Sequence, residues 1–212
     1  PRLAAKHKIK VTVGAWLNKD PKTNMEEVRS AIELANTQDN VIRVLIGNEA
    51  IWRKDVTVEQ MIEYLDYARQ RSKEPVSTAE QWHVWLEHPE LAKHVDFIAV
   101  HMLPFWEGID VKDAVPFIEQ QMQRLEQAFP NKRIIITEVG WPSDGRTRGL
   151  AVASASNEAL FLRRFLATAK REGYIYYIME AFDQPWKASG EGSVGSYWGV
   201  YDVDRRPKFA FS

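Results

Sequence analysis

The sequence predicts an α/β fold in which helices cover the outside of a parallel sheet. Short runs rich in β-branched residues alternate with segments of helical periodicity along the whole chain. The run VIRVLI at 41–46 is almost continuously apolar, as is typical of a strand buried on both faces. The chain has 212 residues, 45% of them hydrophobic, which suffices for one sizeable core. No internal repeat or linker interrupts it, so we expect a single domain spanning 1–212.

Six strands and the helices that connect them follow from these patterns. Strands are expected at 9–17, 41–46, 75–79, 95–101, 133–137 and 174–182. Helices are expected at 25–35, 57–71, 80–86, 114–129 and 156–172. Thr57 and Gln60 form a capping box at the start of the second helix, and Met61, Ile62, Leu65 and Ala68 would be its buried stripe. The Gly-rich segment 189–199 is expected to be a loop.

Two architectures fit this alternation. A doubly wound sheet would normally carry a Gly-rich phosphate loop after its first strand, but that position reads Val13-Gly14-Ala15-Trp16-Leu17 and matches neither phosphate-binding motif. The other architecture is a (β/α)₈ barrel, whose active site lies at the carboxyl ends of the strands.

Composition excludes several classes of partner and site. The net charge is −1, which provides no field of one sign to bind nucleic acid. No run approaches the ~18 apolar residues of a membrane-spanning helix. Cysteine is absent, which excludes disulfides and thiolate metal sites, and the spacing of His83, His88 and His94 gives no metal-binding motif. We therefore expect neither a metal nor a cofactor. Eight tryptophans would suit a cleft that stacks sugars.

Two glutamates follow strongly apolar strands at the end of the sheet where barrel enzymes work. Glu49 follows the second strand and Glu138 ends the fifth. Burial and a shared cleft would separate the two pKa values, giving one proton donor and one nucleophile, as glycoside cleavage requires. A single glutamate at a strand end is more often a salt-bridge or capping partner, so the argument depends on the pair. Arg53 is close in sequence to Glu49, and we expect it to point away or to pair with an acid.

Further candidates stand at the same strand ends. The amide of Asn48 could bind a substrate hydroxyl, and His101 could bind substrate or orient a carboxylate. Candidate sugar platforms are Trp106, Trp141, Trp186 and Trp198, with packing of the barrel rim as the alternative for all but Trp141. Glu107 and Asp183 are candidate hydroxyl acceptors at the rim, and Glu180, carried by the last predicted strand, is a further candidate for substrate binding.

Three of these segments carry a family resemblance. Gly47-Asn48-Glu49 and Thr137-Glu138-Val139-Gly140-Trp141-Pro142-Ser143 resemble the two signatures of glycoside hydrolase family 17, which contains β-1,3-glucanases and glucanosyltransferases. Residues 180–187 resemble the strand-eight segment of its bacterial and fungal branch, except that Gln184 stands where that branch usually has Glu. The resemblance implies that Glu49 is the acid/base on strand four and Glu138 the nucleophile on strand seven. The chain would then be a (β/α)₈ barrel lacking its first two βα units, with 9–17 and 174–182 as open sheet edges.

The activity implied is retaining cleavage of β-1,3-glucan through a covalent glycosyl-enzyme, by a hydrolase or a transglycosylase. Two alternatives remain: a catalytically silent glucan-binding module that kept the fold, and a related retaining glycosidase acting on another β-linked polysaccharide. The expected partner is a β-glucan, and this substrate class implies a location outside the cytoplasm. The bacterial branch includes domains attached to membrane-bound glucan synthases, so a larger membrane-associated parent protein is also implied.

Overall fold

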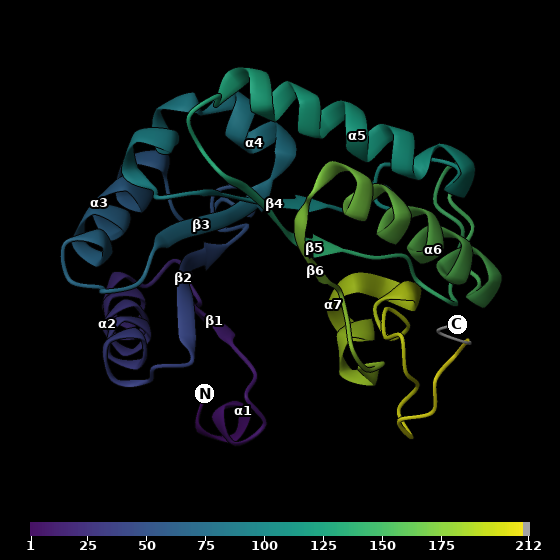
Figure 1. The fold of residues 1–212 in the computed structure, drawn as a ribbon, viewed down its shortest axis with the longest axis horizontal. Coiled ribbons are helices and arrows are strands. Elements are labelled where there is room, and N and C mark those ends of the chain that lie inside the picture. Colours follow the sequence, from purple (N-terminus) through teal and green to yellow (C-terminus); the bar gives the residue numbers. More distant parts are fainter. Residues whose placement is uncertain (210–212) are drawn as a thin grey trace. The chain divides into compact units, whose positions relative to one another are not determined.

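The computed structural model describes residues 1–209, which contain a six-stranded sheet (Figure 1). The strands are β1 (Val11–Ala15), β2 (Val41–Asn48), β3 (Val76–Gln81), β4 (Ile98–Met102), β5 (Ile134–Val139) and β6 (Ile175–Ile178). Their order in the sheet is their order in the sequence, and β1 pairs in parallel with β2, as β2 does with β3. A doubly wound sheet would reverse its strand order, whereas a (β/α)₈ barrel never does. The predicted barrel-type α/β fold is confirmed.

Seven α-helices are assigned in the same part of the chain. They are α1 (Arg2–Lys6), α2 (Pro21–Thr37), α3 (Val58–Arg69), α4 (Trp82–Glu87), α5 (Val111–Ala128), α6 (Ala155–Glu172) and α7 (Ala188–Glu191). The five expected helices are present as α2 to α6. Several boundaries differ from the prediction. Glu80 and Gln81 belong to β3 and not to the following helix, α2 begins at Pro21 rather than at residue 25, and β6 ends at Ile178 rather than at residue 182. The expected loop at 189–199 also contains most of α7 and a short 3₁₀ turn, Gly192–Val194.

The chain divides into two compact units. The first contains Pro1–Val100 and Leu125–Ile135, and the second contains His101–Arg124 and the residues from Ile136 onward. The division passes through β4 and β5, so the carboxyl ends of these two strands belong to the second unit. A single domain spanning the chain stays a prediction.

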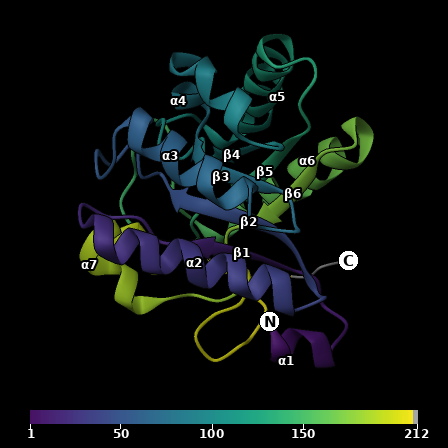
Figure 2. The same ribbon diagram turned by 90° about the vertical axis from the view of Figure 1, so that its left-hand side faces the viewer.

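In the first unit, α2 lies along β1 and β2 (Figure 2). Asp20 caps this helix by accepting a hydrogen bond from the Lys22 N–H, and Pro21 occupies its first turn. The next helix, α3, starts with the predicted capping box of Thr57 and Gln60. Its buried face consists of Met61, Tyr64, Leu65 and Ala68, so Tyr64 takes the place predicted for Ile62.

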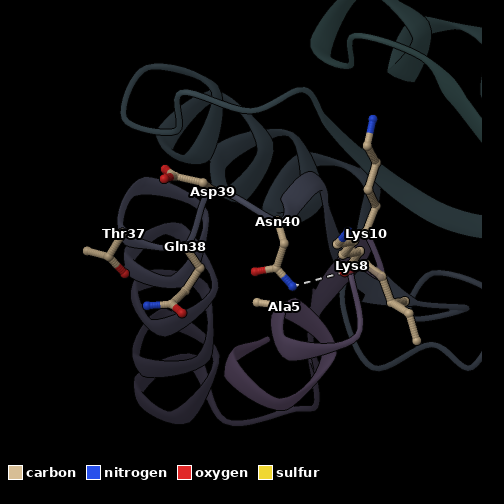
Figure 3. Close-up of a pocket in the computed structure, with 8 residues that line it drawn as sticks. Ala5, Lys8, Lys10, Thr37, Gln38, Asp39 and Asn40 are labelled. Atoms are coloured by element: carbon tan, nitrogen blue, oxygen red, sulfur yellow. Dashed lines mark hydrogen bonds between the residues drawn. The ribbon is translucent and has the colours of Figure 1, made fainter.

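A shallow pocket lies at the amino end of β1, where Asn40 donates a hydrogen bond to the Ile9 carbonyl (Figure 3). Its lining comes from α1, the segment just before β1, the last residue of α2 and the turn before β2: Ala5, Lys8, Ile9, Lys10, Thr37, Gln38, Asp39 and Asn40. Parallel strands place their carboxyl ends at the opposite edge. The pocket is therefore at the other end of β2 from Glu49 and plays no part in the predicted site.

The two outer strands of the described sheet are β1 and β6, as expected. The segment after β6 is not open, however. Glu180 donates its N–H to the Trp198 carbonyl, Tyr201 donates its N–H to the Ala181 carbonyl, and Phe182 forms a parallel bridge with Tyr201. The expectation of an open edge across 174–182 is thus wrong for its last residues, because the chain folds back along them.

Candidate active site

The loop that carries Glu49 leaves β2 through two residues with left-handed backbone. Gly47 has φ +84° and Glu49 has φ +52°, a conformation that is costly for a residue with a Cβ. The Glu49 N–H donates to the Ala79 carbonyl of β3 at 2.7 Å. The Gln81 amide, also on β3, donates to Glu49 Oε1 at 2.6 Å. Backbone and side chain of Glu49 are therefore both fixed by the neighbouring strand.

Glu80 supports the same loop from β3. Its side chain is completely buried, and its carboxylate accepts hydrogen bonds from the N–H groups of Ile51 at 2.8 Å and Trp52 at 3.4 Å. Sequence reasoning missed Glu80 and Gln81 because the run Ser77-Thr78-Ala79 lacks large apolar residues, which hid the length of the strand. The signal that could have found Glu80 is its position near the carboxyl end of the third strand, comparable to that of Glu49 just after the second.

Arg53 lies in the turn after Glu49, and its charge is paired with a carboxylate. Its Nε donates to Asp55 Oδ2 at 2.9 Å, so its charge is paired with an acid. Its guanidinium lies 4.3 Å from the centre of the Trp16 ring. The structure thus confirms that this arginine pairs with an acid.

Glu138 lies in β5, in the second unit, beside His101 at the end of β4. His101 is buried, and its Nδ1 lies 3.5 Å from Glu138 Oε2. The side chain of Glu138 remains 27% exposed, which leaves its carboxylate accessible to a substrate. The predicted proximity of His101 to a carboxylate is therefore observed, and Glu138 is the carboxylate concerned.

The packing around Gly140 and Trp141 shows why the loop after Glu138 needs a glycine and a tryptophan at these positions. A Cβ on Gly140 would lie 2.1 Å from the Met179 carbonyl oxygen, so only glycine fits there. Trp141 is fully buried, and its indole N–H donates to the Val152 carbonyl at 3.0 Å. Its ring packs edge-to-face on Phe105, with centroids 5.4 Å apart. Trp141 therefore offers no exposed ring face to a sugar in this conformation.

The other candidate platforms differ in exposure. Trp186 is 70% exposed, whereas Trp198 is fully buried. Trp106 is half-buried, and its ring lies 5.7 Å from that of Trp198 and 5.4 Å from the Arg148 guanidinium. Trp106 and Trp186 are thus the two predicted platforms with accessible ring surface.

Glu180 is held by two donors from the segment that follows it. Its Oε2 accepts hydrogen bonds from the Gln184 amide at 2.5 Å and from Lys187 Nζ at 2.8 Å. The carboxylate is only 13% exposed. A glutamine at position 184 donates a hydrogen bond that a glutamate, when ionised, could not. This contact gives Gln184 a physical role at the position where the sequence resemblance predicted an acid.

Asp183 takes part in a buried polar cluster. Its Oδ1 accepts from Lys208 Nζ at 2.6 Å and from the Gly199 N–H at 3.0 Å. Lys208 also donates to Ser143 Oγ at 2.6 Å. One lysine near the end of the described chain thereby joins the loop after β5 to the loop after β6.

Glu158, on α6, completes this cluster and was not singled out from the sequence. It is buried, and Lys208 Nζ lies 3.9 Å from its Oε2. Burial raises the pKa of Glu158 to about 8, the charge of Asp183 adds to this rise, and Lys208 opposes it. Within residues 1–209 neither of its oxygens has a hydrogen-bond partner.

A family model and curated relatives indicate the family of this chain. A family model described as the BtgE/BtgC glycoside hydrolase domain matches residues 1–199. The chain is 29% identical over 198 residues to a probable family 17 glucosidase, SCW4, of Saccharomyces cerevisiae, covering 90% of this chain and 50% of that protein. It is 28% identical to the cell surface mannoprotein MP65 of Candida albicans, covering 84% of this chain and 48% of that protein. The chain spans about half the length of these curated relatives.

Solved structures show the same fold. A family 17 β-1,3-glucanosyltransferase from Rhizomucor miehei aligns with a TM-score of 0.87 and 25% identity, covering 97% of this chain and 77% of that one. An active-site mutant of the Rhizomucor miehei glucanosyltransferase in complex with laminaritriose aligns with a TM-score of 0.88 at 24% identity and the same coverage. Among the described helices, none combines the length and apolar character needed to cross a membrane.

Proposed function

We propose that this chain, which belongs to the BtgE/BtgC glycoside hydrolase domain family within glycoside hydrolase family 17, cleaves β-1,3-glucan with retention of configuration. The observation that supports this most is the placement of the two glutamates. Glu49 directly follows β2 and Glu138 lies at the end of β5, in a sheet whose strands follow the sequence order. Barrel enzymes perform their chemistry at these strand ends.

In the proposed mechanism, Glu138 is the nucleophile and Glu49 the acid/base. The Glu138 carboxylate attacks the anomeric carbon while protonated Glu49 gives its proton to the departing glycosidic oxygen. A glycosyl ester on Glu138 forms, and Glu49 then removes a proton from the acceptor as that acceptor displaces the ester. The mechanism requires the two carboxyl groups to lie about 5 Å apart in the working enzyme.

The surrounding residues have supporting roles in this proposal. His101 holds the Glu138 carboxylate from one side, consistent with their 3.5 Å separation. Asn48 binds a substrate hydroxyl, and Glu180 and Asp183 contribute acceptors after β6. Trp106 and Trp186 stack on sugar rings, since both have exposed surface. Trp141 contributes to sugar binding by shaping the loop after Glu138, because its own ring is buried.

The acceptor decides between two outcomes. Water gives hydrolysis and a sugar hydroxyl gives a longer or branched glucan, and both share the first half-reaction. The relatives include proteins named as glucosidases and one named as a glucanosyltransferase, so both outcomes belong to the proposal.

The test is product analysis on laminarin with wild type, Glu138→Gln and Glu49→Gln. Wild type should yield shorter chains, elongated chains or both, and each substitution should lower the rate by at least about 10³-fold. Glu126 is an exposed glutamate on α5. The same substitution there, Glu126→Gln, is the matched control and should retain full activity. Laminarin binding without any product would favour a silent glucan-binding module and contradict the proposal. Turnover of another β-linked polysaccharide in preference to laminarin would assign a different substrate.

The proposal extends to location and context. The relatives include a protein named as a cell surface mannoprotein, which supports a location outside the cytoplasm. SCW4 and MP65 are about twice as long as this chain, which supports a place in a larger protein. Cell fractionation followed by detection of the protein in the envelope or medium would test the location.

A further inference from the structure

We infer that Arg53 is a positioning residue for Glu49, and this inference rests on the acid/base role proposed above. Arg53 lies in the turn after Glu49, and its guanidinium is 4.3 Å from the centre of the Trp16 ring. Its three groups of N–H donors face three different acceptors. Nε donates to Asp55, Nη1 to the Asn48 carbonyl, and Nη2 to the Leu17 carbonyl at 2.8 Å.

These contacts reach both peptide groups that flank Glu49. The guanidinium holds the carbonyl of Asn48, which belongs to the peptide before Glu49. The Arg53 backbone N–H donates to the Glu49 carbonyl at 2.8 Å, which belongs to the peptide after it. The direction of a side chain is set by the two peptides on either side of it. One residue thus fixes the direction in which the Glu49 carboxyl group leaves the backbone.

The loop needs such support because its backbone conformation is unfavourable. A residue with a Cβ is strained at φ +52°, and this conformation persists only when its surroundings impose it. Without the guanidinium, the peptide between Asn48 and Glu49 can turn toward a more relaxed conformation. Leu17 lies just beyond β1, so Arg53 also links the ends of two adjacent strands.

Arginine is suited to this role and lysine is not. The planar guanidinium presents donors in a fixed fork, and its flat face stacks on an aromatic ring. A lysine ammonium at the same place could reach one or two of the three acceptors and has no flat face. Asp55 pairs with the guanidinium, and the two side chains are 23% and 20% exposed. Arg53 therefore supplies hydrogen bonds to the loop without adding an unbalanced positive charge next to a proton donor.

A displaced acid/base has a distinct kinetic signature. Cleavage of laminarin needs a proton on the leaving oxygen, whereas dinitrophenolate leaves an aryl glycoside without one. A positioning defect at Glu49 should therefore slow the first step only for laminarin. The second step needs Glu49 to deprotonate water, but azide needs no deprotonation. Azide attacks the anomeric carbon, a carbon–nitrogen bond forms, the ester bond to Glu138 breaks, and a glycosyl azide is released with the Glu138 carboxylate restored.

The experiment compares Arg53→Met, Arg53→Lys and the control Arg71→Met. Arg71 also stacks on an aromatic ring, with its guanidinium 3.9 Å from the Tyr67 centroid, and it donates to a backbone carbonyl. On laminarin we expect kcat to fall about 10²-fold for Arg53→Met, with KM changed less than about threefold. Arg53→Lys should fall less, and Arg71→Met should match wild type. On a dinitrophenyl β-glucoside, Arg53→Met should keep the first-step burst, and azide should accelerate turnover with release of the glycosyl azide.

Two results would overturn the inference. One is laminarin turnover by Arg53→Met at the wild-type rate. The other is an equal loss on laminarin and on the aryl glucoside with no azide product, measured per folded molecule by circular dichroism, since that pattern indicates a general structural role. Glu49→Ala separates this failure from failure of the proposed function. If Glu49→Ala still cleaves laminarin, the acid/base assignment itself is wrong, whatever Arg53→Met does.

Discussion

Gln184 donates a hydrogen bond of 2.5 Å from its amide to Glu180 Oε2, at a position where the resemblance to family 17 predicts an acid. The same carboxylate oxygen accepts from Lys187, so Glu180 is held by one neutral and one charged donor. With an amide at position 184, Glu180 is the only carboxylate in this contact. An acid at position 184 would place two carboxylates next to each other.

The first prediction is that Gln184→Glu destabilises the protein at neutral pH. Two ionised carboxylates would face each other at hydrogen-bond distance and one donor would be lost, which should cost about 1–3 kcal/mol. Protonation of either group removes the repulsion, so the loss should shrink as the pH falls through the carboxyl range. Urea unfolding at pH 4.5 and 7.5 measures both values. The exposed Gln127→Glu is the control, and an equal effect in both variants would contradict the prediction.

The second prediction concerns the buried carboxyl of Glu158, whose pKa is about 8 in the folded protein against 4.5 for the free side chain. A raised carboxyl pKa means that the folded state retains a proton that the unfolded state has lost. Between pH 4.5 and 8 this group should therefore lower the free energy of unfolding by about 1.4 kcal/mol per pH unit as the pH rises. Glu158→Gln has no such proton, so its free energy of unfolding relative to that of wild type should rise through this pH range. Above pH 8 the difference between the two proteins should stay constant. A difference that does not depend on pH would show that the carboxyl is not shifted.

The third prediction is that Gly140→Ala is severely destabilising. The new Cβ would meet the Met179 carbonyl oxygen at 2.1 Å, and that atom is backbone and cannot rotate away. We expect a loss of at least about 2 kcal/mol, measured as a lowered urea midpoint. Gly190→Ala in α7 is the matched control, because nothing lies within 4 Å of its Cβ position. It should be neutral or stabilise by up to about 1 kcal/mol.

The fourth prediction is a coupling between Lys208 and Asp183, whose side chains are 10% and 7% exposed. Lys208→Met leaves a buried carboxylate without its cation, which should cost about 3 kcal/mol. Adding Asp183→Asn should recover part of this loss, and a double-mutant cycle in thermal or urea unfolding measures the coupling. The exposed pair of Lys73 and Asp39 is the comparison, since breaking it should cost under about 1 kcal/mol. Additive effects at Lys208 and Asp183 would show that the buried pair is not coupled.

Much of the fold could be predicted from local patterns. The run at 41–46 predicted β2, in which Val41, Val44 and Ile46 are buried, and Thr57 with Gln60 marks the start of α3 by satisfying its free N–H groups. These signals are local, and each is visible in a few consecutive residues. The extension of β3 to Gln81 was not visible, since Ser77 and Thr78 are buried through contacts distant in sequence, such as the hydrogen bond from Ser77 to the Phe97 carbonyl.

The candidate site was predictable where a motif marks it and less so where packing decides. Position after an apolar strand singled out Glu49, Glu138 and His101. Burial of Trp141 depends on Phe105 and Phe161, which come from other parts of the chain. The same holds for Glu158 and Lys208, which are separated by fifty residues in sequence and meet only after folding. A tryptophan beside a motif cannot reveal whether its ring faces a ligand or the core.

The left-handed backbone at Glu49 implies that function and stability compete at this position. The side chain proposed to carry the proton is also the one whose Cβ makes φ +52° unfavourable. Glycine adopts this conformation freely and asparagine tolerates it better than glutamate does. Replacing Glu49 with either residue would thus remove the proposed chemistry and raise the melting temperature. Stability alone would therefore favour another residue at this position, and only the proposed proton transfer requires a glutamate there.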